Sequence, residues 1–145
     1  MRLWKTMAVA LALTMVPVIA SAQFKDLDTA MSNLDRGFGK GDAQAIIAGI
    51  ADGDQVMLQF PGLIEQSGFF GRDQAALLLD GLFNKAKPAS FEQRSARKVS
   101  AEGQYHITAT WTIQANGKPE ARDLYVTLRN KGDHWAVVSV RSASK

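Results

Sequence analysis

Two histidines, His106 and His134, are the side chains of this sequence that could serve most kinds of chemistry. A zinc site takes three or four ligands, and the chain has no cysteine to complete such a set. No Gly-x-Ser-x-Gly motif is present, and the closely spaced glycines follow a predicted helix rather than a strand. The sequence therefore predicts no metal site, no cofactor, no acyl-transfer centre and no dinucleotide site.

A cluster of basic residues could bind an anion: it consists of Arg94, Arg97 and Lys98. In an unbroken strand successive side chains alternate between the two faces, so Arg94 and Lys98 would share one face and Arg97 would take the other. The spacing predicts separate charges on a solvated surface. The alternative is a site for an anionic polymer of the cell envelope.

Aromatic residues form the third group of interest, because binding sites for small molecules are concave and mostly apolar. The candidates are Phe60, Phe69, Phe70, Phe83, Tyr105 and Trp111. One interpretation is that they fill the core, as bulky apolar residues usually do. The other is that they line a pocket for a small apolar ligand, open near Phe69 and Phe70, with Tyr105 as its polar group.

The element that must position these residues is residues 104–114, QYHITATWTIQ. Apolar and polar side chains alternate there without a break, which predicts a half-buried antiparallel strand with Tyr105 and Trp111 on its apolar face. The other face carries His106 and a series of threonines. That threonine face is predicted either to lie in solvent or to pair two copies of the chain.

The remaining pattern predicts an α+β fold. Amphipathic spacing predicts helices over 24–38, 43–50 and 72–85, and alternation predicts strands over 55–60, 90–100, 104–114, 122–130 and 134–141. Residues 63–71 are predicted to form a loop. The expected architecture is a curved antiparallel sheet wrapped around three N-terminal helices.

Glycine, aspartate and proline predict the limits of the helices. Gly37, Gly39 and Gly41 are expected to end the first helix. Asp42 is expected to cap the second through its carboxylate, and Pro88 to follow the third as a stop.

Residues 1–22 predict a cleaved secretory signal: two basic residues, an apolar run over 7–19 and the small residues Ala20-Ser21-Ala22. The remaining single domain, 23–145, would be periplasmic or secreted and would have no membrane span. Both basic residues of the leader leave with it, so 15 basic and 14 acidic residues remain, a net charge of +1. This balance predicts no nucleic-acid partner. Charge is divided along the chain, −5 over residues 23–83 and +6 over 84–145, and the two parts are expected to attract each other.

The element order, together with the segments FKDLDTAMSNLDRGFGKGDAQAI, DQVMLQFPG, FFGRDQAALLLDGLF, PASFEQ and GQYHITATWT, resembles the nuclear transport factor 2-like (cystatin-like cone) superfamily. More narrowly, these segments resemble small secreted bacterial proteins grouped as domain of unknown function 4783. The resemblance covers nearly all of 23–145. It implies a cone-shaped fold, which by itself assigns no function.

The superfamily also contains ketosteroid isomerase, whose acid and base residues can be compared with this chain. The positions that match its general base and its oxyanion-hole tyrosine hold Phe60 and Leu34, and its protonated aspartate falls near Leu124 or Tyr125. Proton abstraction needs a base and oxyanion donors, and this sequence lacks those residue types there.

Three functions remain open from the sequence. The first is an exported, non-catalytic module that binds a small apolar ligand or a protein partner. The second is an isomerase, cyclase or dehydratase with a relocated acid–base pair, drawn from Asp54, Asp123, Tyr105 and His106. The third is a structural or assembly module that dimerises through the outer face of its sheet.

Overall fold

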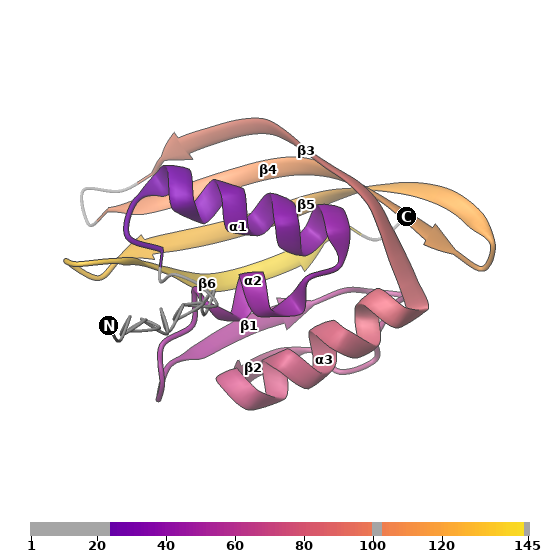
Figure 1. Ribbon diagram of the computed structural model, residues 1–145, viewed down its shortest axis with the longest axis horizontal. Coiled ribbons are helices and arrows are strands. Elements are labelled where there is room, and N and C mark those ends of the chain that lie inside the picture. Colours follow the sequence, from indigo (N-terminus) through magenta and orange to yellow (C-terminus); the bar gives the residue numbers. More distant parts are fainter. Residues whose placement is uncertain (1–23, 100–102, 144–145) are drawn as a thin grey trace, which may run out of the picture.

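A computed structural model describes residues 24–99 and 103–143 of the chain (Figure 1). Its elements are α1 (Leu27–Lys40), α2 (Ala43–Ile47), β1 (Gln55–Gln59), β2 (Gly68–Gly71), α3 (Arg72–Lys85), β3 (Ala86–Lys98), β4 (Gln104–Ala115), β5 (Lys118–Asn130) and β6 (Trp135–Ser142). The predicted leader, 1–22, lies outside the described residues, as does Ser100, which was expected at the end of a strand.

One six-stranded sheet, in the order β2-β1-β6-β5-β4-β3, forms the body of the molecule. Neighbouring strands are antiparallel except β1 and β6, which run parallel. Figure 1 shows α1 lying across the sheet, α2 and α3 beside it, and the β4–β5 hairpin projecting beyond the helices. The predicted α+β architecture, a curved and largely antiparallel sheet that wraps three helices, is confirmed.

The first helix runs through two glycines that were expected to end it. α1 begins three residues later than predicted and continues to Lys40, and the left-handed residue that terminates it is Gly41, with φ of 77°. Gly37 is required for packing and not for ending the helix, since a Cβ there would lie 2.4 Å from Ile46 Cγ1. Its missing side chain lets α2 pack closely on α1.

The second helix is shorter than expected, ending at Ile47 instead of residue 50. Asp42 occupies its N-cap position, but the carboxylate makes no capping hydrogen bond. The prediction of a side-chain cap is wrong, because Asp42 Oδ2 lies 3.3 Å from Arg36 Nε and pairs with that guanidinium instead.

Two parts of the sheet differ from the sequence pattern. Residues 63–71 were predicted as a loop, yet Gly68–Gly71 forms β2, which pairs with β1 and places Phe70 opposite Val56. Pro88 was predicted to follow the third helix as a stop, but β3 starts directly after Lys85 and contains it. A proline is tolerated there because β3 is an edge strand with a register shift at that point.

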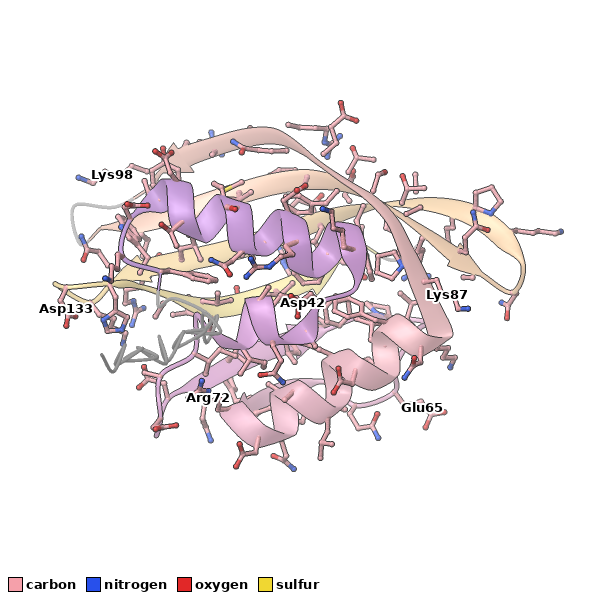
Figure 2. The ribbon with its side chains drawn as sticks, viewed as in Figure 1. Asp42, Glu65, Arg72, Lys87, Lys98 and Asp133 are labelled. Carbon is pink, nitrogen blue, oxygen red and sulfur yellow. The ribbon has the colours of Figure 1, made fainter. Side chains whose placement is uncertain are left out.

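The two faces of the sheet differ in burial as the alternation predicted. On β4 the side chains of Ile107, Ala109, Trp111 and Ile113 are buried beneath the helices, while the intervening threonines are half-buried on the outer face. Charged side chains such as Glu65, Lys87, Lys98 and Asp133 lie at the periphery (Figure 2).

The ion pairs among the described residues do not link the two oppositely charged parts of the chain. Each joins residues of the same part, as Arg72 with Asp52 and Arg94 with Asp123 do. The two parts are joined by the shared apolar core, by the pairing of β1 with β6 and by hydrogen bonds such as that from Trp111 Nε1 to Phe38 O. Within the described residues no helix is both long enough and apolar enough to cross a bilayer.

Candidate functional site

A cluster of aromatic rings fills the space between α1 and the sheet. Phe38 lies at its centre, with its ring centroid 5.6 Å from that of Trp111 and 5.7 Å from that of Phe83, both in edge-to-face geometry. Phe60 contacts both Phe38 and Trp111, at 6.4 and 5.9 Å. The buried indole Nε1 donates a hydrogen bond to Phe38 O at 2.9 Å, so the polar atom of Trp111 is satisfied inside the core.

The structure brings three of the six predicted aromatic residues together: Phe60, Phe83 and Trp111. Phe70 is partly buried against the core, and Phe69, on the other face of β2, is 68% exposed. The central member, Phe38, and Phe91, whose ring stacks on it, were not among the candidates. Phe38 is the last residue of the segment 24–38, for which the sequence predicts an amphipathic helix.

Tyr105 lies outside this aromatic cluster and packs against another residue. Its ring lies edge-to-face with that of Trp135, with the centroids 6.0 Å apart, toward the other end of β4 from Trp111. Both rings are partly buried and pack against the core.

The candidates for a relocated acid–base pair do not meet. His106 and Asp123 lie on the outer face of the sheet, and Asp123 is bound by Arg94 Nη2 at 2.7 Å. Asp54 sits in the turn before β1, and Tyr105 lies on the inner face. Of the positions compared with ketosteroid isomerase, Phe60, Leu34 and Leu124 are buried among apolar neighbours. Tyr125, the alternative to Leu124, is half-buried on the outer face.

One cation is buried beside the aromatic cluster. Arg122, opposite Trp111 in the sheet register, is 8% exposed. Its Nη1 donates to Pro61 O at 2.5 Å, and its Nε lies 3.3 Å from Glu120 Oε1. These contacts hold the guanidinium against the Pro61 turn, a structural role.

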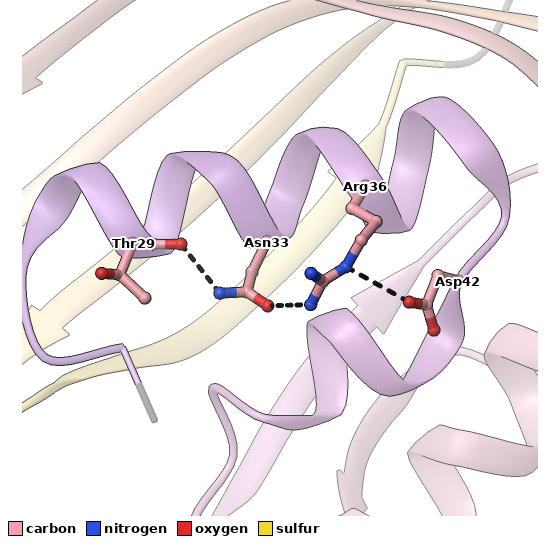
Figure 3. A network of polar contacts seen from close by, with 4 residues as sticks. All are labelled: Thr29, Asn33, Arg36 and Asp42. Atoms are coloured by element: carbon pink, nitrogen blue, oxygen red, sulfur yellow. Dashed lines mark hydrogen bonds and ion pairs between the residues drawn. The ribbon is translucent and has the colours of Figure 1, made fainter. Parts of the chain in front are cut away.

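A polar network joins the first two helices (Figure 3). The buried Asn33 amide donates to Thr29 O at 2.9 Å and accepts from Arg36 Nη2 at 2.8 Å. Arg36 in turn pairs with Asp42 at the start of α2. The network satisfies a buried side chain and positions α2 on α1.

The second histidine has a local partner. His134 Nδ1 lies 2.6 Å from Asp133 Oδ1, and this hydrogen bond lowers the pKa of the exposed Asp133 carboxyl. Over residues 24–99 and 103–143, no group of three or more His, Cys, Asp and Glu side chains is arranged to hold a metal ion.

A β-bulge changes the faces that the basic residues occupy. The register shifts between Gln93 and Ser95, so that Arg97 lies opposite His106 on the outer face and Lys98 lies opposite Tyr105. Arg94 reaches Asp123 and therefore also lies on the outer face. The predicted separation of Arg94 from Arg97 is wrong, because the bulge inserts one extra residue and reverses the alternation after it.

Two rows of side chains cross the outer face as a result. The first row consists of Arg97, His106, Thr127, Ser139, Met57 and Phe69. The second consists of Ser95, Thr108, Tyr125, Arg141 and Gln59. Hollows of about 230 Å³ and about 390 Å³ lie on this face and share Tyr125 and Arg141.

Sequence comparisons give no assignment: no family model and no curated protein matches the chain. Structural comparisons do find similar proteins. A domain-of-unknown-function-4783 family protein from Bacteroides fragilis superposes with a TM-score of 0.63 at 20% identity, over 78% of this chain and 96% of that one. A member from Bacteroides uniformis gives 0.64 at 13% identity, over 79% and 95%.

A nuclear transport factor 2-like protein of unknown function from Shewanella oneidensis is also similar, with a TM-score of 0.59 at 14% identity over 81% of this chain and 96% of that one. Likeness at these identities establishes the fold. The predicted nuclear transport factor 2-like cone is thereby confirmed, and structures from the narrower family are among those that share it.

Proposed function

We propose that this protein is an exported, non-catalytic binding domain whose ligand or partner contacts the outer face of its sheet rather than the interior of the cone. The observation that carries the proposal is the packing of four aromatic rings against one another between the helices and the sheet: Phe38, Phe60, Phe83 and Trp111. All four are nearly or completely buried, and the one polar atom among their side chains is hydrogen-bonded.

The distribution of ionisable groups supports a non-catalytic role. The buried polar residues of the described chain are Asn33, Arg122 and Ser142, and none of these is a general base at neutral pH. The carboxylates considered for acid–base chemistry lie outside the core. Of these, Asp123 is already engaged by Arg94.

The sheet supports the choice of the outer face. Its half-buried threonines and its two hollows form a polar, contoured surface. Export directed by the leader predicted over 1–22 would bring the domain to the periplasm or outside the cell, where its partner would be a small molecule or another protein.

A thermal-shift screen of wild type and two matched variants tests the proposal. Thr108→Phe fills the floor of the smaller hollow, whereas Thr112→Phe makes the same change on the same strand and face outside it. Compounds or proteins that bind the outer face should stabilise wild type and T112F but not T108F. A ligand at a hundredfold excess over its Kd contributes about 2.7 kcal/mol.

A different result would place the site inside the cone. Ligands that stabilise T108F as much as wild type, and lose that effect in Tyr105→Leu, would contradict the outer-face proposal. They would favour an apolar site near Tyr105 and Trp135.

A further inference from the structure

The smaller hollow on the outer face has the composition of an anion site. It measures about 230 Å³ and is lined by Ser95, Arg97, His106, Ile107, Thr108, Tyr125, Thr127 and Arg141. Three of these side chains are basic, four carry hydroxyl groups, and none is a carboxylate.

The shape of the hollow follows from the strand register. Thr108 and Thr127 are short and lie on two neighbouring strands, β4 and β5. Long side chains stand on either side of them, Arg97 on the edge strand β3 and Arg141 on β6. The bulge in β3 is essential, because without it Arg97 would face the other side of the sheet.

The two arginines are available for a ligand. Among the described residues, neither Arg97 nor Arg141 lies within ion-pair distance of a carboxylate. Asp123, on the same face, is bound by Arg94 at 2.7 Å and does not line the hollow. Arg141 is held in place, with its Cζ 5.1 Å from the centroid of the Tyr125 ring.

We infer that this hollow binds the oxyanion group, phosphate or carboxylate, of a small hydroxylated molecule such as a sugar phosphate or a sugar acid. Two guanidinium groups and an imidazole match the charge of the oxyanion, and the serine and threonine hydroxyls match the hydroxyl groups of the ligand. Tyr125 and Arg141 also line the adjoining hollow of about 390 Å³ with Gln59 and Ser142, which gives room for the rest of the ligand. The inference rests on the proposed outer-face function and specifies its ligand.

The test is a titration of the protein, purified after expression of the full chain, with glucose 6-phosphate, glucuronate and neutral glucose. NMR would follow the Arg97 and Arg141 side chains and the His106 ring, and calorimetry would give the Kd. At least one of the two anions should bind and shift these resonances, with glucose having no effect. The anion that binds more tightly identifies phosphate or carboxylate as the preferred group, and added salt should weaken its binding.

Arg97→Gln and Arg141→Gln should each weaken binding about tenfold to a hundredfold, the range expected for loss of a charged hydrogen bond. Arg129→Gln removes the same charge from an exposed site on β5 outside the hollow and should leave the Kd unchanged. Urea denaturation of each variant would establish that it is folded.

Absence of binding by both anions, or binding unchanged in the Arg97→Gln, Arg141→Gln double variant, would overturn the inference. If that happens while Thr108→Phe still abolishes binding of another ligand in the thermal-shift screen, the anion assignment fails and the outer-face function stands. If Thr108→Phe has no effect on any ligand, both fail.

Discussion

Gly49 illustrates how one missing methyl group can determine local packing. A Cβ at this position would lie 2.4 Å from Phe24 Cε2 and 2.7 Å from Val137 Cγ2. The Gly49 carbonyl also accepts a hydrogen bond from Val137 N at 2.9 Å, so the backbone cannot move away without breaking a contact. Gly81 is the opposite case, since its Cβ position in α3 has no neighbour within 4 Å.

We predict opposite effects from the same substitution at these two positions. Gly49→Ala should lower the free energy of unfolding by about 1–3 kcal/mol through overpacking. Gly81→Ala should raise it by about 0.5–1 kcal/mol, because alanine is the better helix former at an exposed helical site. Urea denaturation measures both, and equal effects of the two changes would contradict the packing at Gly49.

At the scale of elements, α1 depends on the residue before it. Asp26 is its N-cap, and Oδ1 accepts the Thr29 backbone N–H at 2.7 Å. This hydrogen bond lowers the pKa of the Asp26 carboxyl from its ordinary value of 3.8. Because the pKa of this carboxyl is lower in the folded state than in the unfolded state, the ionised carboxylate stabilises the fold at pH values above the unfolded-state pKa. That stabilisation is lost as the pH falls through the folded-state pKa of Asp26.

Asp26→Asn should therefore be less stable than wild type at neutral pH, with a difference that disappears at pH values well below 3.8. Asparagine keeps an N-cap, so α1 should still begin at the same residue. Urea midpoints measured for both proteins across this range give the comparison. Both proteins contain the same other carboxylates, so these cancel in the comparison. A stability difference between the two proteins that does not change with pH would show that the charge of Asp26 does not stabilise the fold.

At the scale of the whole molecule, the first described residue contributes to the core. The Phe24 ring is fully buried against Gly49, and its carbonyl accepts a hydrogen bond from Trp135 N at 2.6 Å. Phe24 is thus hydrogen-bonded to Trp135, the first residue of β6. If the leader is removed after Ala22, this ring belongs to the second residue of the mature chain.

Phe24→Ala should lower the free energy of unfolding by about 3–5 kcal/mol, the usual range for a buried phenylalanine. Lys25→Ala, at the exposed neighbour, should change it by no more than about 0.5 kcal/mol. Phe24→Leu keeps part of the apolar contact and should lose less than the alanine variant. Fluorescence and circular dichroism would follow unfolding, and a Phe24→Ala protein as stable as wild type would mean that the ring does not support the core.

Much of the fold could be predicted because local sequence periodicity reflects burial. Alternation over β4 identified which side chains face the helices, and α3 was predicted to the residue. The sequence does not predict the role of a glycine when that role is to make room for a residue of another element. Gly37 lies inside α1, where its missing side chain makes room for Ile46 of α2, and the local sequence pattern does not contain this contact. The strand β2 was missed for the same reason, since four residues with two glycines form a strand only when β1 lies beside them.

By itself the sequence determined the α+β class, the apolar face of β4 and the absence of a carboxylate at the positions compared with ketosteroid isomerase. These properties depend on residue types and spacings along one segment. The tertiary structure alone decided that Phe38 joins Phe60, Phe83 and Trp111, and that Arg97 and Arg141 stand on one face of the sheet. Both depend on distances between segments far apart in the chain. The second also depends on register shifts in β3 and β6, each of which reverses the alternation of the side chains that follow it in its own strand.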